Sequence, residues 1–280
     1  MIELDHLEKV YLAREGSHRA LHDVSLTIGE GEIFGIIGQS GAGKSTLVRC
    51  INLLERPTSG RILIDGVDVT NYQGRDLRRL REGIGMIFQN PLDSLNPVYT
   101  TGSQVEEAIL LDGLNHAQAW KKVLKLYQDV KMPDAGERAK SYPHEMSGGM
   151  RQRVMIAMML SRNPELLIAD EPTNGLDEAG RAQFFALLDS IFPDAAKLII
   201  THDISVASRC DRVLVLCGGR MLETDASSTV LRAPRHPYTK ALLAAQVANG
   251  MQPSPVLREG VSGCPFYARC PEANATCLND

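Results

Sequence analysis

Five short apolar segments along the chain predict buried strands. They cover residues 33–37, 84–88, 166–169, 198–200 and 213–216. Each is too short for a helix and too uniformly apolar for a half-exposed sheet, which is the pattern of parallel strands buried on both faces. Helix-length stretches such as 44–53 and 179–191 lie between them. The alternation predicts an α/β core with a mostly parallel sheet.

Three regions depart from this alternation. The first 30 residues, and residues 61–64 with the Asp65-Gly66 turn after them, have the pattern of antiparallel strands. Residues from about 102 to 162 contain no strand-like segment and predict inserted helices, with breaks at 132–134 and 142–143. From about residue 226 the chain is rich in proline. This last part is expected to be an irregular appended tail.

A glycine-rich segment directly after the first apolar strand predicts a phosphate-binding loop. Residues 38–46 read GQSGAGKST, which fits G-x-x-x-x-G-K-[ST] between a strand and a helix. Glycines allow successive N–H groups to face phosphate oxygens, and the helix adds its positive end. We expect Lys44 to bind the β- and γ-phosphates and Ser45 to ligate Mg²⁺. The nucleotide-binding residues are then Gly38, Ser40, Gly41, Ala42, Gly43, Lys44, Ser45 and Thr46. A glycine-rich turn with a chance lysine is the weaker interpretation.

Polar groups follow three of the other predicted strands. Asp170 and Glu171 end the strand 166–169, where open α/β sheets bind ligands. Asp170 suits Mg²⁺, and Glu171 suits a base that polarises water for attack on the γ-phosphate. His202 and Gln89 follow two further strands and are expected to contact the γ-phosphate, the attacking water or the metal. Each alone is more simply explained as a turn residue or a strand-ending polar residue, but together they favour a catalytic edge.

Composition narrows the class of protein. The chain has 280 residues, of which 44% are hydrophobic and 23% charged, as in ordinary globular proteins. Its formal charge of -4 argues against a general nucleic-acid binder. The longest apolar run, 154–160, is too short to cross a bilayer, and the N-terminus lacks the pattern of a signal peptide. We therefore expect the chain to stay on the cytoplasmic side of the membrane, with its six cysteines reduced or binding metal.

Residues 146–153, MSGGMRQR, identify a family. With the phosphate loop, Gln89, Asp170-Glu171, the segment 175–177 and His202, they resemble the ATPase subunit of ATP-binding cassette (ABC) transporters over residues 2–245. The resemblance implies a P-loop NTPase (RecA-like) core in an ABC ATPase domain of residues 1–228, with the core at 1–88 and 162–228. It further implies a helical subdomain at about 89–161 and a tail at 229–280. The implied reaction is ATP and water to ADP and phosphate, coupled to transport, in the translocase class.

The segment 146–153 also has a physical interpretation. Ser147 is placed to cap a helix that begins with Gly148 and Gly149, which leaves N–H donors and a positive end for an anion. It has no lysine of its own and so resembles half a site. The family implies that two such subunits, identical or related, pack head to tail, with each ATP between the phosphate loop of one and the signature segment of the other.

The resemblance adds two further candidate residues and two departures. Asp177 belongs to the family's D-loop, and Tyr11 lies where the family has an adenine-stacking aromatic. A tyrosine packed on a strand is the alternative for Tyr11. Met146 replaces the usual Leu, and Asn174-Gly175 replaces a more usual Thr or Ser with Ala.

The two halves of the chain resemble different importers. Residues 2–88 look like methionine-importer ATPases, whereas residues 89–97, 142–146 and 236–240 look like peptide and nickel importers. A fusion, natural or engineered, or an unusual branch would explain this. We favour the peptide or nickel class because the second half includes the region that receives the membrane subunits. The implied partners are a second ATPase subunit, integral membrane permeases and, indirectly, an extracytoplasmic solute-binding protein. No nucleic acid is implied, and the expected location is peripheral, at the cytoplasmic face of the inner or plasma membrane.

The tail contains Cys264, Cys270 and Cys277. It resembles the tail of peptide-importer ATPases, some of which hold a [4Fe–4S] cluster. Such a cluster normally takes four thiolates, and the remaining cysteines fall in the core, so reduced bystander thiols are the favoured interpretation. The competing functional hypothesis is a non-transport ABC ATPase that acts as a clamp on DNA, on ribosomes or in iron–sulfur assembly; a small-molecule kinase is a third.

Overall fold

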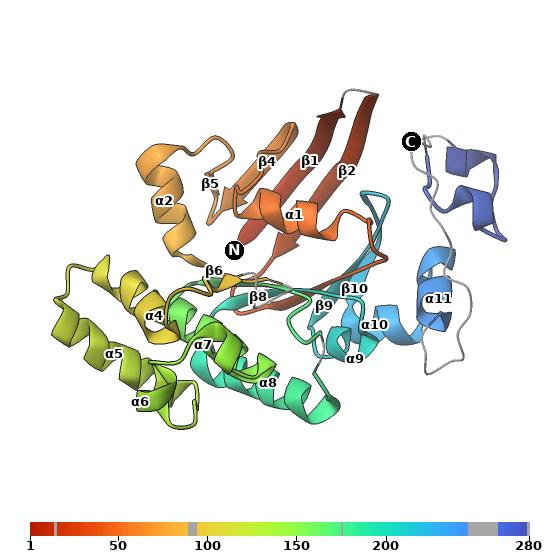
Figure 1. Cartoon of the computed structure of the whole chain (residues 1–280). Helices are drawn as coiled ribbons and strands as arrows, with labels where there is room; N and C mark the ends of the chain where they lie inside the picture. The colour runs from red at the N-terminus through yellow and green to blue at the C-terminus, as the bar shows by residue number, and fades with distance from the viewer. Residues whose placement is uncertain (14–15, 89–93, 175, 246–262, 279–280) are drawn as a thin grey trace. The chain divides into compact units, whose positions relative to one another are not determined.

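The computed structural model describes residues 1–13, 16–88, 94–174, 176–245 and 263–278. The chain forms two compact units, one of Met1–Arg78 with Ala196–Asp280 and one of Arg79–Ala195. We call them the first and second units. Figure 1 shows their elements in chain order.

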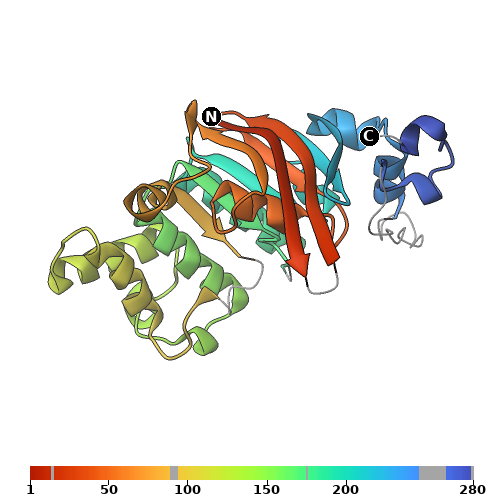
Figure 2. The same cartoon turned by 90° about the horizontal axis from the view of Figure 1, so that it is seen from above.

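The N-terminal part of the first unit is an antiparallel sheet, as the sequence predicts. Its strands are β1 (Ile2–Ala13), β2 (Gly16–Ile28), β4 (Ser59–Ile64) and β5 (Val67–Asp68), in the order β2-β1-β4-β5. Figure 2 shows β1, β2 and β4 side by side. Apolar side chains alternate towards the core, and those of Leu7, Leu21 and Val24 are fully buried.

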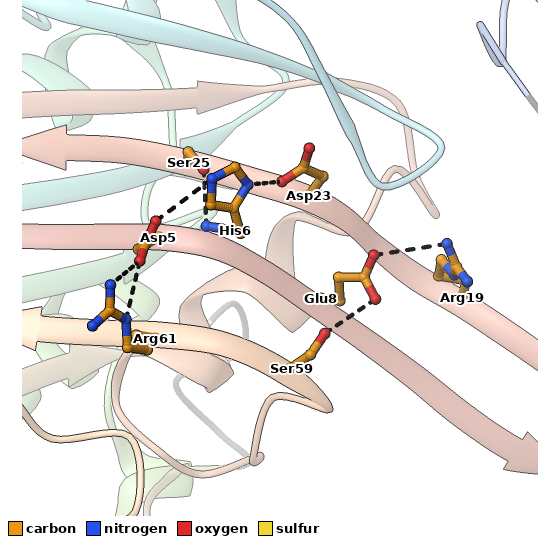
Figure 3. Close-up of polar contacts among 8 residues, drawn as sticks. All are labelled: Asp5, His6, Glu8, Arg19, Asp23, Ser25, Ser59 and Arg61. Atoms are coloured by element: carbon orange, nitrogen blue, oxygen red, sulfur yellow. Dashed lines mark hydrogen bonds and ion pairs between the residues drawn. The ribbon is translucent and has the colours of Figure 1, made fainter. Parts of the chain in front are cut away.

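The pairing of β1 with β2 shifts register around His6 and Asp23, both of which have positive φ. On the exposed face at this irregularity His6 Nδ1 lies 2.5 Å from Asp23, and Arg61 pairs with Asp5 at 2.6 Å (Figure 3). Asp23, and to a lesser extent Asp5, raises the pKa of His6. These exposed pairs contribute little stability, since solvent screens them.

The rest of the first unit contains three of the five predicted buried strands. β3 (Ile33–Ile37) runs parallel to β8 (Ala196–Thr201) and β9 (Arg212–Cys217), and β10 (Arg220–Ala226) pairs antiparallel with β9. Phe34, Leu198 and Leu214 are fully buried in this sheet. The helices of this unit are α1 (Lys44–Ile51), α9 (Ile204–Ala207), α10 (Ser227–Arg232) and α11 (Pro237–Ala244), with short 3₁₀ turns at Tyr267–Arg269 and Ala275–Leu278. Helix α2 (Gly74–Glu82) connects the two units.

The second unit combines two parallel strands with helices. β6 (Ile84–Ile87) pairs with β7 (Leu166–Asp170). Between them in sequence lie α4 (Thr101–Leu110), α5 (His116–Asp129), α6 (Ala135–Arg138), a 3₁₀ turn (Pro143–Glu145) and α7 (Gly148–Leu160), and α8 (Glu178–Ile191) follows β7. The predicted helical insertion and its two breaks are confirmed. Among the described residues, every helix is too short or too polar to cross a bilayer.

Candidate nucleotide site

The predicted phosphate loop leaves β3 and enters α1 through tightly packed glycines. A Cβ on Gly38 would lie 2.2 Å from the carbonyl oxygen of Leu216, and one on Gly43 would lie 2.6 Å from that of Ala20. Gly43 is also the N-cap of α1, with φ of 100°. Both positions therefore exclude any side chain, and the backbone folds as closely as a phosphate cradle requires.

Lys44 is the chemical centre of this loop. Its side chain is 8% exposed, and its ammonium donates to the carbonyl oxygens of Gly38 at 2.7 Å and Gln39 at 2.9 Å. A buried ammonium is stable only when polar groups surround it. The loop carbonyls thus hold the charge in place, and phosphate oxygens are the anionic acceptors that suit it best. The remaining predicted loop residues, Ser40, Gly41, Ala42, Ser45 and Thr46, are all in the same turn and the start of α1.

His202 follows a strand that is paired with the one before the loop. Ile37, the last residue of β3, is opposite Thr201, the last residue of β8. Because the strands are parallel, Gly38 and His202 leave the sheet side by side at the same edge. The side chain of His202 is exposed. The next residue, Asp203, caps α9 by accepting from the Ser205 N–H at 2.8 Å.

Tyr11, the predicted adenine-stacking residue, contacts the start of α1 and has a hydrogen-bonded hydroxyl. It donates to Glu55 and contacts the Thr46 side chain, while the Lys9 ammonium lies 4.9 Å from the centre of its ring. Burial, with the Glu55 carboxylate, raises the pKa of Tyr11. Sequence reasoning missed Lys9 and Glu55. Adenine stacking by Tyr11 stays a prediction.

In the second unit the predicted carboxylates end β7. Ile87 of β6 is opposite Ala169 of β7, so Asp170 and Glu171 directly follow the paired region. Glu171 has φ of 48°, a left-handed conformation that costs a non-glycine residue on the order of 1–2 kcal/mol. Gln89 lies outside the described residues.

A residue that the sequence analysis did not single out supports this strand end. Gln152 of α7 is buried and donates from Nε2 to the carbonyl oxygen of Pro172 at 2.7 Å. Helix α7 is therefore tied directly to the turn that contains Glu171. The sequence did contain one indication of this contact, because Gln152 is a polar residue among the apolar residues of α7.

The signature segment has the geometry predicted for it. Ser147 caps α7 by accepting from the Met150 N–H at 3.3 Å, and both Ser147 and Gly148 are exposed. A Cβ on Gly149 would have no neighbour within 4 Å. Asp177 is exposed and caps α8 by accepting from the Gly180 N–H at 2.8 Å. Gly175 lies outside the described residues.

The three tail cysteines are half-buried. Cys264 lies 3.9 Å from His236 Nε2, and its N–H donates to the carbonyl oxygen of Cys277. The described residues include no group of three or more His, Cys, Asp or Glu side chains arranged to hold a metal ion. In this part of the chain the donor set does not fit an iron–sulfur cluster.

Two family models match the chain. The ABC transporter model matches residues 21–174, and the model of the oligopeptide/dipeptide transporter C-terminal region matches residues 222–277. The second match starts in β10 and covers α10, α11 and the cysteine-bearing tail.

Curated proteins resemble the chain along its whole length. It is 41% identical to the oligopeptide transport ATP-binding protein OppD of Salmonella typhimurium, with 100% of this chain and 88% of that protein covered. It is 38% identical to the dipeptide transport ATP-binding protein DppD of Bacillus subtilis, with 99% and 88% covered. These similarities include residues 2–88, for which the sequence analysis expected a methionine-importer ATPase.

Solved structures confirm the P-loop NTPase fold. A dimeric post-hydrolysis state of the ATP-binding cassette MJ0796 bound to ADP and Pi gives a TM-score of 0.74 at 30% identity, covering 81% of this chain and 99% of that one. CbiO1 of Clostridium perfringens, part of the ABC transporter complex cbiONQ, gives 0.73 at 29% identity, covering 87% and 94%. With the phosphate loop, the strand-end carboxylates and the signature helix all present, the chain belongs to the ABC transporter family.

Proposed function

We propose that the chain is the ATP-binding and ATP-hydrolysing subunit of a peptide importer. The buried Lys44 ammonium in its glycine cradle is the observation that carries ATP binding. The peptide class is supported by the match to the oligopeptide/dipeptide C-terminal region and by the relatives named as oligopeptide and dipeptide transport proteins. Those relatives favour peptides over nickel or methionine, and transport over the soluble clamp.

ATP binding is centred on Lys44. Its ammonium donates to the backbone carbonyls of Gly38 and Gln39, and phosphate oxygens are anionic acceptors with which it can form charge-assisted bonds. Mg²⁺, held by Ser45, Asp170 and Gln89, would neutralise the charge on the phosphates, and hydroxyl, carboxylate and amide oxygens are donors that this ion accepts.

Hydrolysis is assigned to Glu171. Its carboxylate orients the water and accepts a proton as that water attacks the γ-phosphate, which yields ADP and phosphate. The position of Glu171 directly after β7, at the end of the paired region, is the structural feature that supports the assignment. His202, exposed at the end of β8, contacts the γ-phosphate and the attacking water.

The transport role requires other chains. The exposed start of α7 at Ser147 and Gly148 supplies N–H donors to the ATP held by a second ATPase subunit in a head-to-tail dimer, and Asp177 belongs to the same interface. Permease subunits in the membrane form the path for the peptide, and an extracytoplasmic solute-binding protein delivers it. The ATPase subunit is therefore peripheral to the membrane, on its cytoplasmic face.

The substitution Glu171→Gln tests this assignment. In the complex with permease subunits, phosphate release should fall by about 10²–10⁴-fold while binding of a fluorescent ATP analogue stays within about twofold, since the amide keeps the shape but is no base. Glu178→Gln, in the exposed first turn of α8, is the matched control and should hydrolyse normally. Near-normal turnover by Glu171→Gln would rule out this role.

A further inference from the structure

The phosphate loop packs against the end of β9 and the turn between β9 and β10. Gly219 donates its N–H to the carbonyl oxygen of Ala42 at 2.9 Å, and Gly38 packs against the carbonyl of Leu216. The loop therefore depends on residues about 175 positions later in the chain, which belong to the C-terminal part of the first unit.

Tyr238 of α11 makes a further contact with the loop. Its side chain is fully buried, and its hydroxyl oxygen accepts from the Gln39 N–H at 3.2 Å. Burial raises the pKa of Tyr238, so the hydroxyl stays protonated, and it is also hydrogen-bonded to the Cys217 thiol. Two hydrogen-bond partners fix the direction of a buried hydroxyl group. A side chain that only filled space at this position would need no hydrogen-bond partner.

Tyr238 is bonded to Gln39, one of the residues whose backbone carbonyls accept from the Lys44 ammonium. The Gln39 carbonyl accepts from the Lys44 ammonium at 2.9 Å and from the Ala42 N–H at 3.1 Å, while the Gln39 N–H donates to Tyr238. Gln39 is thus fixed on one side by α11 and on the other side fixes the cation. A shift of its backbone would move an acceptor of the ammonium.

The C-terminal segment 263–278 supports Tyr238 in turn. Phe266 is 4% exposed and packs edge-on against the Tyr238 ring, with centroids 5.5 Å apart. Its neighbour Pro265 covers Gly218, where an added Cβ would lie 2.8 Å from the proline ring. The segment 263–278 therefore packs on both supports of the phosphate loop, which are Tyr238 and the β9–β10 turn.

Glu223 fixes the start of α11. Its carboxylate accepts from the backbone N–H groups of Arg235 and His236.

We propose that Tyr238 is a positioning residue for nucleotide binding: its hydroxyl fixes Gln39, and through Gln39 the ammonium of Lys44, with Phe266 holding the tyrosine ring in place. In this proposal the C-terminal region helps to position the residues that bind phosphate. This inference rests on the proposed binding of ATP by the loop.

The substitution Tyr238→Phe tests it by removing one oxygen. The full chain is titrated with trinitrophenyl-ATP and Mg²⁺, and the dissociation constant should rise roughly threefold to tenfold, the range that one neutral hydrogen bond sustains. Tyr267→Phe, which removes the same atom from a half-buried tyrosine of the segment 263–278, is the control and should bind like wild type.

Hydrogen exchange separates positioning from general destabilisation. Without nucleotide, Tyr238→Phe should speed exchange in peptides that contain the Gln39 amide and leave those from β8 unchanged, since the backbone N–H that loses its acceptor is that of Gln39. Faster exchange throughout the first unit would show a structural role and overturn the proposal.

A second variant keeps the test decisive if Tyr238→Phe folds poorly. Phe266→Leu keeps an apolar side chain but loses the aromatic edge contact, and should weaken nucleotide binding about twofold. The double variant should lose less binding free energy than the two single variants lose together, because Phe266 acts through the Tyr238 hydroxyl. Wild-type affinity in both single variants would refute the positioning role, whereas failure of the wild-type chain to bind the analogue would refute the proposed function instead.

Discussion

Two helix starts in this molecule present N–H groups to an anion, and they differ in how complete they are. At the start of α1, Gly43 has a left-handed backbone, packed against Ala20, and the buried Lys44 supplies a positive charge. At the start of α7, Ser147 is exposed and Gly149 has open space where a side chain would be. The comparison supports the proposal that α1 binds an anion within its own chain, whereas α7 is suited to supply donors and a helix dipole to an anion held by another chain.

Arg151, in the first turn of α7, is the cation to compare with Lys44. Arg151 donates from Nη1 to the carbonyl oxygens of Met146 at 2.6 Å and Pro143 at 3.4 Å. Arg151, like Lys44, therefore bonds backbone carbonyls of the segment before its helix, but Arg151 is half-buried whereas Lys44 is buried within its glycine loop.

Of the substitutions at the two helix starts, Lys44→Ala should have the largest effect, a loss of ATP affinity at the start of α1. Removing the ammonium leaves the phosphates without their charge-assisted donor, and ATP affinity of the isolated chain should fall on the order of a hundredfold. Isothermal titration with ATP and Mg²⁺ measures this. Lys121→Ala, an exposed lysine of α5, is the control. Unchanged affinity for Lys44→Ala would remove the distinction between the two helix starts.

Gly38→Ala should disrupt the α1 site by shape alone. The added methyl would lie 2.2 Å from the Leu216 carbonyl oxygen, so the loop and the β9–β10 turn have to separate. We expect a loss of about 2 kcal/mol or more in the free energy of unfolding, measured by urea denaturation, together with loss of nucleotide binding. A variant as stable as wild type would show that the loop is less closely packed than described.

Ser147→Ala should have a smaller and local effect. The hydroxyl is the N-cap of α7, and losing a serine cap costs about 1 kcal/mol. Urea denaturation should show that loss while ATP binding by the isolated chain stays normal. Weakened ATP binding in the isolated chain would mean that the α7 start contributes to the same chain's own site.

Gly149→Ala should change the isolated chain least. Because the added methyl meets nothing within 4 Å and alanine favours a helix, the free energy of unfolding should stay level or rise by up to about 1 kcal/mol. In the assembled transporter the same methyl would occupy space needed by the phosphates of the ATP that a second subunit holds. The rate of ATP hydrolysis should therefore fall. Normal hydrolysis by the assembled Gly149→Ala variant would contradict the half-site interpretation.

The sequence predicted local chemistry better than long-range support. The phosphate loop, the strand before it and the carboxylates after β7 carry their signals within a few residues, and the structure has them at 33–37, 38–46 and 170–171. The contact between Tyr238 and Gln39 joins residues 199 positions apart, and no local pattern indicates it.

The C-terminal region shows the same limit. Its prolines suggested an irregular tail, yet Pro237 occupies the first turn of α11, where a proline lacks no hydrogen bond, and the helix runs on to Ala244. Strand β10 was also missed, because its residues RMLETDA are only half-buried at the edge beside β9 and show no apolar run. Such elements depend on tertiary packing more than on local sequence.

Hydrogen exchange of the isolated chain with and without ATP and Mg²⁺ tests the central claim most directly. The account predicts nucleotide-dependent protection of the amides of residues 38–46 and unchanged exchange at residues 147–151 when no second subunit is present. Protection at 147–151 with no change at 38–46 would contradict it.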